Sequence, residues 1–145
     1  MKKNAKKNNK GFSLVELIIV VAIMAILIGV LGGQYLKFVE KSRQSADKSN
    51  VDEIIRAVQI YSADPDATTA VADGEKIVLS ENAAPTLTPA DGGLDAALDA
   101  AGMNVTNLKL KSDAWGSVTI EFDVTDGQVS ATVTCSKAGA PSITD

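Results

Sequence analysis

A single carboxylate stands inside the longest apolar run of the chain. Glu16 is the only ionisable side chain between Gly11 and Gln34, and the run from Phe12 to Gly33 is 22 residues long. As an α-helix this run would extend about 33 Å, which is enough to span a bilayer. Because a carboxylate at membrane depth costs roughly 2.5–3.5 kcal/mol, we expect Glu16 to need a specific cationic partner.

The chain itself offers no suitable cation for Glu16. Five lysines precede the apolar run and would lie on the headgroup side of the membrane as a positive-inside flank. The next basic residue after the run is Lys37, about 30 Å from Glu16 along a helix. The sequence therefore implies a partner that lies outside the chain.

The residues around Glu16 resemble a known signal. The order Lys10-Gly11-Phe12-Ser13-Leu14-Val15-Glu16, followed by an apolar helix, is similar to the class III signal of type IV pilins and pseudopilins. The resemblance implies that a membrane prepilin peptidase cuts between Gly11 and Phe12 and that the new amino group of Phe12 is N-methylated. It also implies that Glu16 pairs with the charged N-terminus, at Phe12, of a neighbouring subunit during assembly.

Two other interpretations of this segment remain. An ordinary secretory signal would end at a small-residue site such as Gly32-Gly33, but its apolar region is shorter and this run carries Glu16 near its start. A plain single-span anchor would not explain the order of residues from Gly11 to Glu16.

Composition excludes several kinds of site. The chain has no histidine and one cysteine, Cys135, so Cys/His metal clusters and an intramolecular disulfide are excluded. Many type IV pilins close their C-terminal region with a disulfide, so this chain must hold its last segment by other means. Cys135 is most simply a small core residue. Since no nucleotide loop, nucleophile–base pair or paired-carboxylate site is apparent, we expect neither an enzyme nor a cofactor.

Charge divides sharply along the chain. The overall formal charge of −4 separates into +5 on the first eleven residues and −9 on residues 12–145. We interpret the basic segment as a topology signal rather than a nucleic-acid arm. The acidic remainder argues against sequence-independent DNA binding by the folded part.

Helical periodicity continues beyond the apolar run, and no proline interrupts it until Asp64-Pro65. One helix from about Phe12 to Ala63 would be about 78 Å long. Its first half has no apolar partner within the chain and must lie in a membrane or against copies of itself. Its second half carries one apolar stripe for burial against a small domain, formed by Val51, Ile54, Ile55, Val58 and Tyr61.

Three glycines, Gly29, Gly32 and Gly33, weaken the helix propensity of the apolar run. Type IV pilins often carry proline where Gly33 stands, in a region that can unwind on assembly. The glycines would permit such unwinding, or close helix packing in the bilayer, and the sequence leaves both open.

The remainder of the chain predicts a small sheet. Residues 64–93 are turn-rich with one possible strand, Ile77 to Leu79, and Leu94 to Gly102 is expected to form a short helix with a glycine C-cap. Strands are expected at Val105–Lys111, Ser117–Thr125 and Gln128–Cys135. A two-residue turn at Asp126-Gly127 would put the apolar residues of the last two strands on one face, by pairing Val124 with Val129, Phe122 with Ala131, Ile120 with Val133 and Val118 with Cys135.

Three local motifs have simple structural interpretations. Trp115 is expected to be a core or rim plug rather than a ligand platform. Asp64, Asp66 and Thr68 alternate like the start of a calcium loop, but the glycine and terminal glutamate of that motif are missing, so we expect a solvated acidic turn and no metal. The glycosylation sequon at Asn104 is interpreted as a chance match, because a chain of this type would be prokaryotic.

Together these patterns predict an α+β protein, with a long N-terminal α-helix packed on a small antiparallel β-sheet in a pilin-like arrangement. The first half of the helix is expected to span a membrane and the second half to be amphipathic. The expected segments are a cleaved basic leader (1–11), a transmembrane and filament-core helix (12–33), its amphipathic continuation (34–63) and a globular domain (64–145). Residues 34–145 are expected to fold as a soluble monomer that Ile55→Asp would unfold.

The expected function is that of a structural subunit of a type IV pilus. One alternative is a pseudopilin of a type II-like secretion or DNA-uptake system, and another is a membrane-tethered binding or adhesion domain that does not polymerise. The expected partners are further copies of the chain, the membrane, a prepilin peptidase and the assembly machinery. We expect the chain in the inner or cytoplasmic membrane before assembly and in an extracellular filament or envelope-spanning pseudopilus afterwards.

Overall fold

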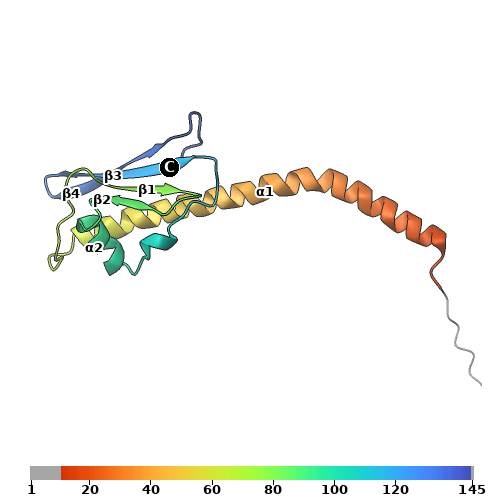
Figure 1. Ribbon diagram of the computed structural model, residues 1–145, viewed down its shortest axis with the longest axis horizontal. Helices are drawn as coiled ribbons and strands as arrows, with labels where there is room; N and C mark the ends of the chain where they lie inside the picture. The colour runs from red at the N-terminus through yellow and green to blue at the C-terminus, as the bar shows by residue number, and fades with distance from the viewer. Residues whose placement is uncertain (1–10, 145) are drawn as a thin grey trace, which may run out of the picture. The chain divides into compact units, whose positions relative to one another are not determined.

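The computed structural model describes residues 11–144, which form one long helix, one short helix, a 3-10 turn and a four-stranded sheet (Figure 1). The chain divides into two compact units, Met1–Val39 and Glu40–Asp145. The basic leader up to residue 10 lies outside the described residues.

A single helix, α1 (Leu14–Ser62), contains both the apolar run and the apolar stripe. It begins two residues after Phe12 and ends just before Asp64-Pro65. A proline disfavours helical backbone at the residue before it, so Pro65 prevents the helix from continuing through Asp64. The helix is continuous through the three glycines at positions 29, 32 and 33. The expectation of one uninterrupted helix is therefore confirmed.

Four antiparallel strands form one sheet in the order β2-β1-β3-β4. Their bounds are β1 (Glu75–Ser80), β2 (Thr86–Thr88), β3 (Ser117–Thr125) and β4 (Gln128–Cys135). Asp126 and Gly127 both have positive φ, as the two-residue type I′ turn requires. The pairing of β3 with β4 follows the predicted register at all four apolar pairs.

The predicted strand at Val105–Lys111 is wrong. Val105–Asn107 form a 3-10 turn, η1, because the Asn104 side chain accepts a hydrogen bond from the Thr106 N–H at 3.0 Å and so caps it. The place beside β3 belongs to β1, which contains the possible strand at Ile77–Leu79 and pairs with β2 on its other side. The alternation of Leu108 and Leu110 reflects loop packing on the core, not a ladder.

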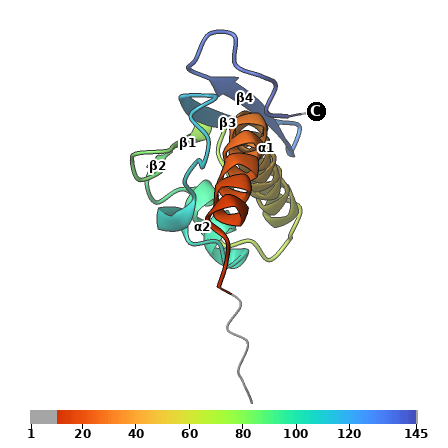
Figure 2. The ribbon, with the colours of Figure 1, turned by 90° about the vertical axis from the view of Figure 1, so that its right-hand side faces the viewer.

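The core of the second unit lies between the apolar stripe of α1 and one face of the sheet (Figure 2). Val51, Ile54 and Val58 are fully buried, while Ile55 and Tyr61 are partly buried against the same cluster. On the sheet, β1 and β3 supply Ile77, Leu79, Val118, Ile120 and Phe122, all buried. The apolar residues of β4, including Cys135, are only half-buried because β4 is an edge strand. Even this partial burial raises the pKa of the Cys135 thiol above its ordinary value.

A carboxylate from the sheet caps the short helix α2 (Gly93–Ala100). Glu75 of β1 is buried and accepts hydrogen bonds from the N–H groups of Gly93 at 3.1 Å and Leu94 at 2.6 Å. These are unpaired donors of the helix N-terminus, where negative charge is favourable. A Cβ on Gly93 would lie 2.3 Å from the Ala70 carbonyl oxygen, so the close approach requires glycine there.

The other end of α2 confirms the expected glycine C-cap. The N–H of Gly102 donates to the carbonyl of Asp99, and the N–H of Met103 donates to the carbonyl of Leu98, both at 2.9 Å. This pair of bonds is a Schellman motif. Met103 also packs against the core cluster, as the hydrophobic contact of that motif requires.

The C-terminal segment is held without a disulfide. Trp115 is fully buried and its indole N–H donates to the carbonyl oxygen of Pro141 at 2.9 Å. Lys137 forms an ion pair with Asp113 at 3.2 Å, and Ile143 is buried in the core. Trp115 is therefore a core residue, as expected, and it also anchors the end of the chain.

A second buried carboxylate joins α1 to the loop that precedes β3. Asp47 is fully buried and accepts hydrogen bonds from the backbone N–H groups of Lys111, at 2.8 Å, and Ser112, at 2.9 Å. The Ser112 hydroxyl donates in turn to Glu40. Burial raises the pKa of the Asp47 carboxyl above its ordinary value, although the two N–H donors oppose this shift.

We predict that Asp47→Asn lowers the free energy of unfolding of residues 34–145 by about 1–3 kcal/mol. Asparagine has one acceptor oxygen, so one of the two loop N–H groups would lose its acceptor and face an amide donor. Asp52→Asn, the same change at an exposed position of α1, is the control and should alter stability little. Urea denaturation monitored by circular dichroism measures both, and equal midpoints for the two variants would contradict the assigned role of Asp47.

Candidate assembly site at the start of the long helix

Ser13 and Glu16 together cap the first turn of α1. Ser13 is the residue before the helix, and Glu16 is its third residue. The Ser13 N–H donates to Oε2 of Glu16 at 2.8 Å, and the Val15 N–H donates weakly to the Ser13 hydroxyl at 3.4 Å. This arrangement is close to a capping box, in which a serine and a glutamate three residues later satisfy the free N–H groups of a helix start.

Sequence reasoning missed this local partner. The sequence near Glu16 contains no suitable cation, as expected. A neutral donor is present, however, because the backbone N–H of Ser13, three residues earlier, donates to the Glu16 carboxylate. The signal was available, since serine followed three residues later by glutamate before an apolar run is the pattern of a capping box. A neutral N–H donor stabilises the carboxylate without removing its charge, so the expectation of a cationic partner stays a prediction.

Gly11, Phe12 and Ser13 precede the helix, and all three are exposed. Phe12 is 88% exposed, although it is the most apolar of the three. The candidate processing residues and the candidate assembly residue therefore lie together at the start of α1, in the first unit. No hydrogen bond within the described chain joins Phe12 to the Glu16 side chain.

The apolar side chains that follow Glu16 are exposed in the part of the chain that the structure describes. By length and composition α1 can cross a membrane, and none of its most apolar 18-residue window is buried. A continuous exposed apolar surface of this length is unstable in water and must be covered by lipid or by other helices. Gly29, Gly32 and Gly33 each leave open space where a Cβ would stand, so a neighbouring helix could approach closely there.

The other candidate sites have structural roles. The N–H of Asp66 donates to Oδ1 of Asp64 at 2.9 Å, which is the local bond of an acidic turn. Within residues 11–144 no group of three or more His, Cys, Asp or Glu side chains could hold a metal ion. Asn104 of the sequon is exposed and caps η1.

Comparison with known proteins finds similarity in the segment that contains this site. Residues 6–32 match the family model of the prokaryotic N-terminal methylation motif. The chain is also similar to the type IV major pilin protein PilA of Myxococcus xanthus (strain DK1622), with 38% identity over 58 residues. That similarity covers 40% of this chain and only 26% of PilA. No solved structure matches the chain.

The long apolar helix followed by a small antiparallel sheet defines a pilin-like class of protein. Within that class, the methylation motif and the similarity to PilA support the type IV pilin family, which is the family that the sequence resembles. Type IV pilins are structural proteins, and the family implies filament assembly and prepilin processing in general.

Proposed function

We propose that this chain is a subunit of a type IV pilus filament that is inserted in the membrane, cleaved between Gly11 and Phe12, and N-methylated at Phe12. The observation that best supports the proposal is the apolar surface of α1 around and beyond the capped Glu16, which is exposed in the described structure. Lipid would cover that surface before assembly. In the filament, bundling of this helix with copies of itself would bury it instead.

In this proposal Glu16 binds the amino group of Phe12 of a neighbouring subunit. The capping bond from Ser13 would hold the carboxylate at the helix start, four residues after the new terminus. In a bundle of apolar helices both charges would leave water, and each is stable there only when it is paired. The pairing would therefore select subunits that have been cleaved, since only these carry the amino group.

Two other functions remain as alternatives. A pseudopilin of a secretion or DNA-uptake system would use the same processing and the same helix to build a shorter, envelope-spanning filament. A membrane-tethered binding or adhesion domain would keep the anchor without polymerising. The matched part of PilA does not separate these, because it covers a minority of both chains.

We expect the mature chain to begin with N-methylated Phe12. Mass spectrometry of purified filaments, or of the membrane fraction, would measure this terminus. Gly11→Asp should leave the leader attached, because a charged side chain would stand at the proposed cleavage site, and it serves as the control. A wild-type N-terminus at Met1 or near Gln34 would contradict the proposal.

A further inference from the structure

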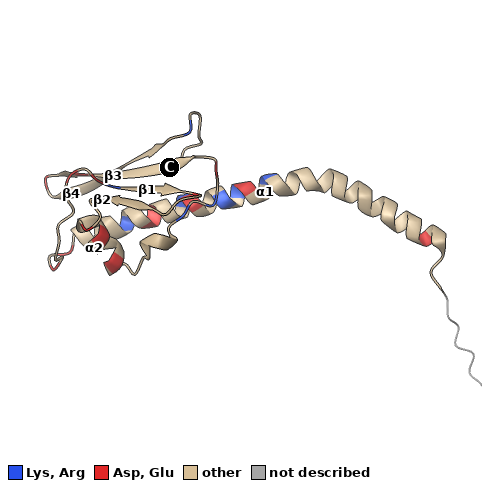
Figure 3. Ribbon diagram, in the orientation of Figure 1, with Lys and Arg blue, Asp and Glu red and all other residues tan. Residues whose placement is uncertain are grey.

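Two groups of charged residues of opposite sign lie near opposite ends of the second unit (Figure 3). Lys41 and Arg43 directly follow Glu40, the first residue of this unit. The helix α2, with its acidic residues, lies beside the C-terminal end of α1 (Figure 3). Thr69 lines the same hollow as the acidic residues of α2, and its N–H donates to the hydroxyl of Tyr61 at 3.3 Å. Tyr61 therefore identifies the end of α1 that lies near α2. Twenty residues of helix separate Lys41 from Tyr61, or about 30 Å.

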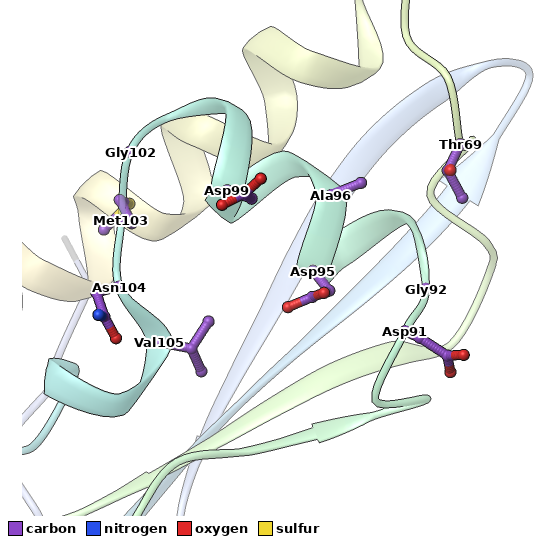
Figure 4. A pocket seen from close by; sticks show the side chains of 10 residues that line it. All are labelled: Thr69, Asp91, Gly92, Asp95, Ala96, Asp99, Gly102, Met103, Asn104 and Val105. Carbon is purple, nitrogen blue, oxygen red and sulfur yellow. The ribbon is translucent and has the colours of Figure 1, made fainter.

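The acidic end presents a hollow of about 600 Å³ along the outer face of α2 (Figure 4). Asp91, Asp95 and Asp99 line it, together with Thr69 and Asn104. Asp95 and Asp99 are four residues apart and therefore lie on the same face of the helix. Within the described part of the chain, neither side chain forms a hydrogen bond or an ion pair, so this face of α2 has no partner.

The two cations at the basic end also have no acidic partner within the described residues. Lys41 and Arg43 are exposed and form no hydrogen bond or ion pair within residues 11–144. The two carboxylates of α1 nearest to them have other partners: Glu40 accepts from Ser112 and from the Gln44 side chain, and Asp47 accepts from the loop N–H groups. The local acids therefore do not pair with these two cations.

We propose that the acidic face of α2 binds the Lys41–Arg43 stretch of α1 from a second copy of this chain. This inference rests on the proposed function, because copies repeated in one direction along a filament bring the α2 end of one copy towards the Lys41 end of another. The two surfaces are complementary in charge, but Lys41 and Tyr61, which mark the two ends, are about 30 Å apart along α1, so we expect the pairing to form between copies and not within one.

The geometry fits a filament better than a closed dimer. The two surfaces are different patches of the same unit, so each copy can use both at once, one towards each neighbour. Such a contact is heterologous, and unless its rotation closes into a ring it continues as an open helical array. The pairing of opposite charges would also set the order and direction in which copies dock.

The experiment measures sheared extracellular filament from cells that express the full chain, at matched membrane levels. Asp95→Lys with Asp99→Lys, and separately Lys41→Glu with Arg43→Glu, should each lower the yield by about tenfold, because each places like charges opposite one another. Combining all four changes should restore most of the yield, since the charges are then exchanged. Asp95→Asn with Asp99→Asn removes the two charges without reversing them and should cause a smaller loss of yield. This variant tests the contact even if the lysine variant fails to fold.

The control is Glu81→Lys with Glu121→Lys, which reverses two other carboxylates that have no partner within the described residues and should leave the yield unchanged. Equal yields from every variant would overturn the inference while the proposed function stands. Loss of yield in both reversed variants without recovery in the combined variant would also overturn the inference. A loss of yield from the Asp95 and Asp99 changes alone would overturn it too, because the acidic face would then bind something other than Lys41 and Arg43. Absence of filaments from the wild type would instead overturn the proposed function.

Discussion

Glu16→Val should abolish filament assembly while leaving membrane insertion and cleavage intact. The variant still carries the apolar run and the Gly11-Phe12 site, and removing a carboxylate makes insertion easier. In the proposed filament, however, the amino group of the neighbouring Phe12 would be buried without a counter-charge. Breaking a buried ion pair by removing one partner typically costs about 3–5 kcal/mol, which is enough to prevent docking. The yield of sheared filament at matched membrane levels measures the effect.

Glu16→Gln is the sharpest control for this prediction. Glutamine can still accept the hydrogen bond from the Ser13 N–H, because a capping box works with either residue, but it has no charge. If the ion pair drives assembly, subunits with glutamine at this position should fail as the valine subunits do. Glu16→Asp keeps the charge with a shorter reach and should be intermediate. Wild-type yield from either the valine or the glutamine variant would eliminate the proposed pairing.

Ile54→Asp should unfold residues 34–145. Ile54 is fully buried between α1 and the sheet, whereas Ile55, the position favoured by the sequence alone, is only partly buried. Losing a buried isoleucine and burying a carboxylate together cost about 4 kcal/mol or more, a large part of the roughly 5–15 kcal/mol that stabilises a domain. Circular dichroism and thermal melting of the purified fragment measure the loss.

Ile60 provides the matched control on the same helix. It is 73% exposed, so Ile60→Asp makes the same chemical change where no core is disturbed. The Ile60→Asp fragment should therefore melt close to the wild-type temperature. Near-identical melting of the Ile54→Asp fragment would refute the packing of α1 on the sheet.

Several features were predictable because their causes are local in sequence. The length of α1 follows from an uninterrupted helical periodicity that ends at Pro65, and the β3–β4 register follows from the Asp126-Gly127 turn. The glycine C-cap of α2 has its partners within five residues. The capping of α1 by Glu16 is equally local, since Ser13 and Glu16 are three residues apart.

The failed strand at Val105–Lys111 has a different origin. Its alternating leucines resemble a strand, but alternation alone cannot distinguish a ladder from a loop whose apolar residues dip into a core. The decisive groups lie far away in the chain, since Asp47 takes the Lys111 N–H from 64 residues earlier. β1 pairs with β2 on one side and with β3 on the other, so the place beside β3 is occupied by β1 and not by this segment.

By itself, the sequence determined the long helix, the resemblance of residues 6–32 to the N-terminal methylation motif, and the last hairpin, because each depends on residues within a few positions of one another. Only the tertiary structure decided that Glu75 caps α2, that Asp47 fixes the loop before β3, and that Trp115 with Ile143 takes the place of a disulfide. These roles belong to polar or large side chains whose partners are brought together by the collapse of the core. A buried group must find its partners wherever folding places them, and the order of residues does not state where that is.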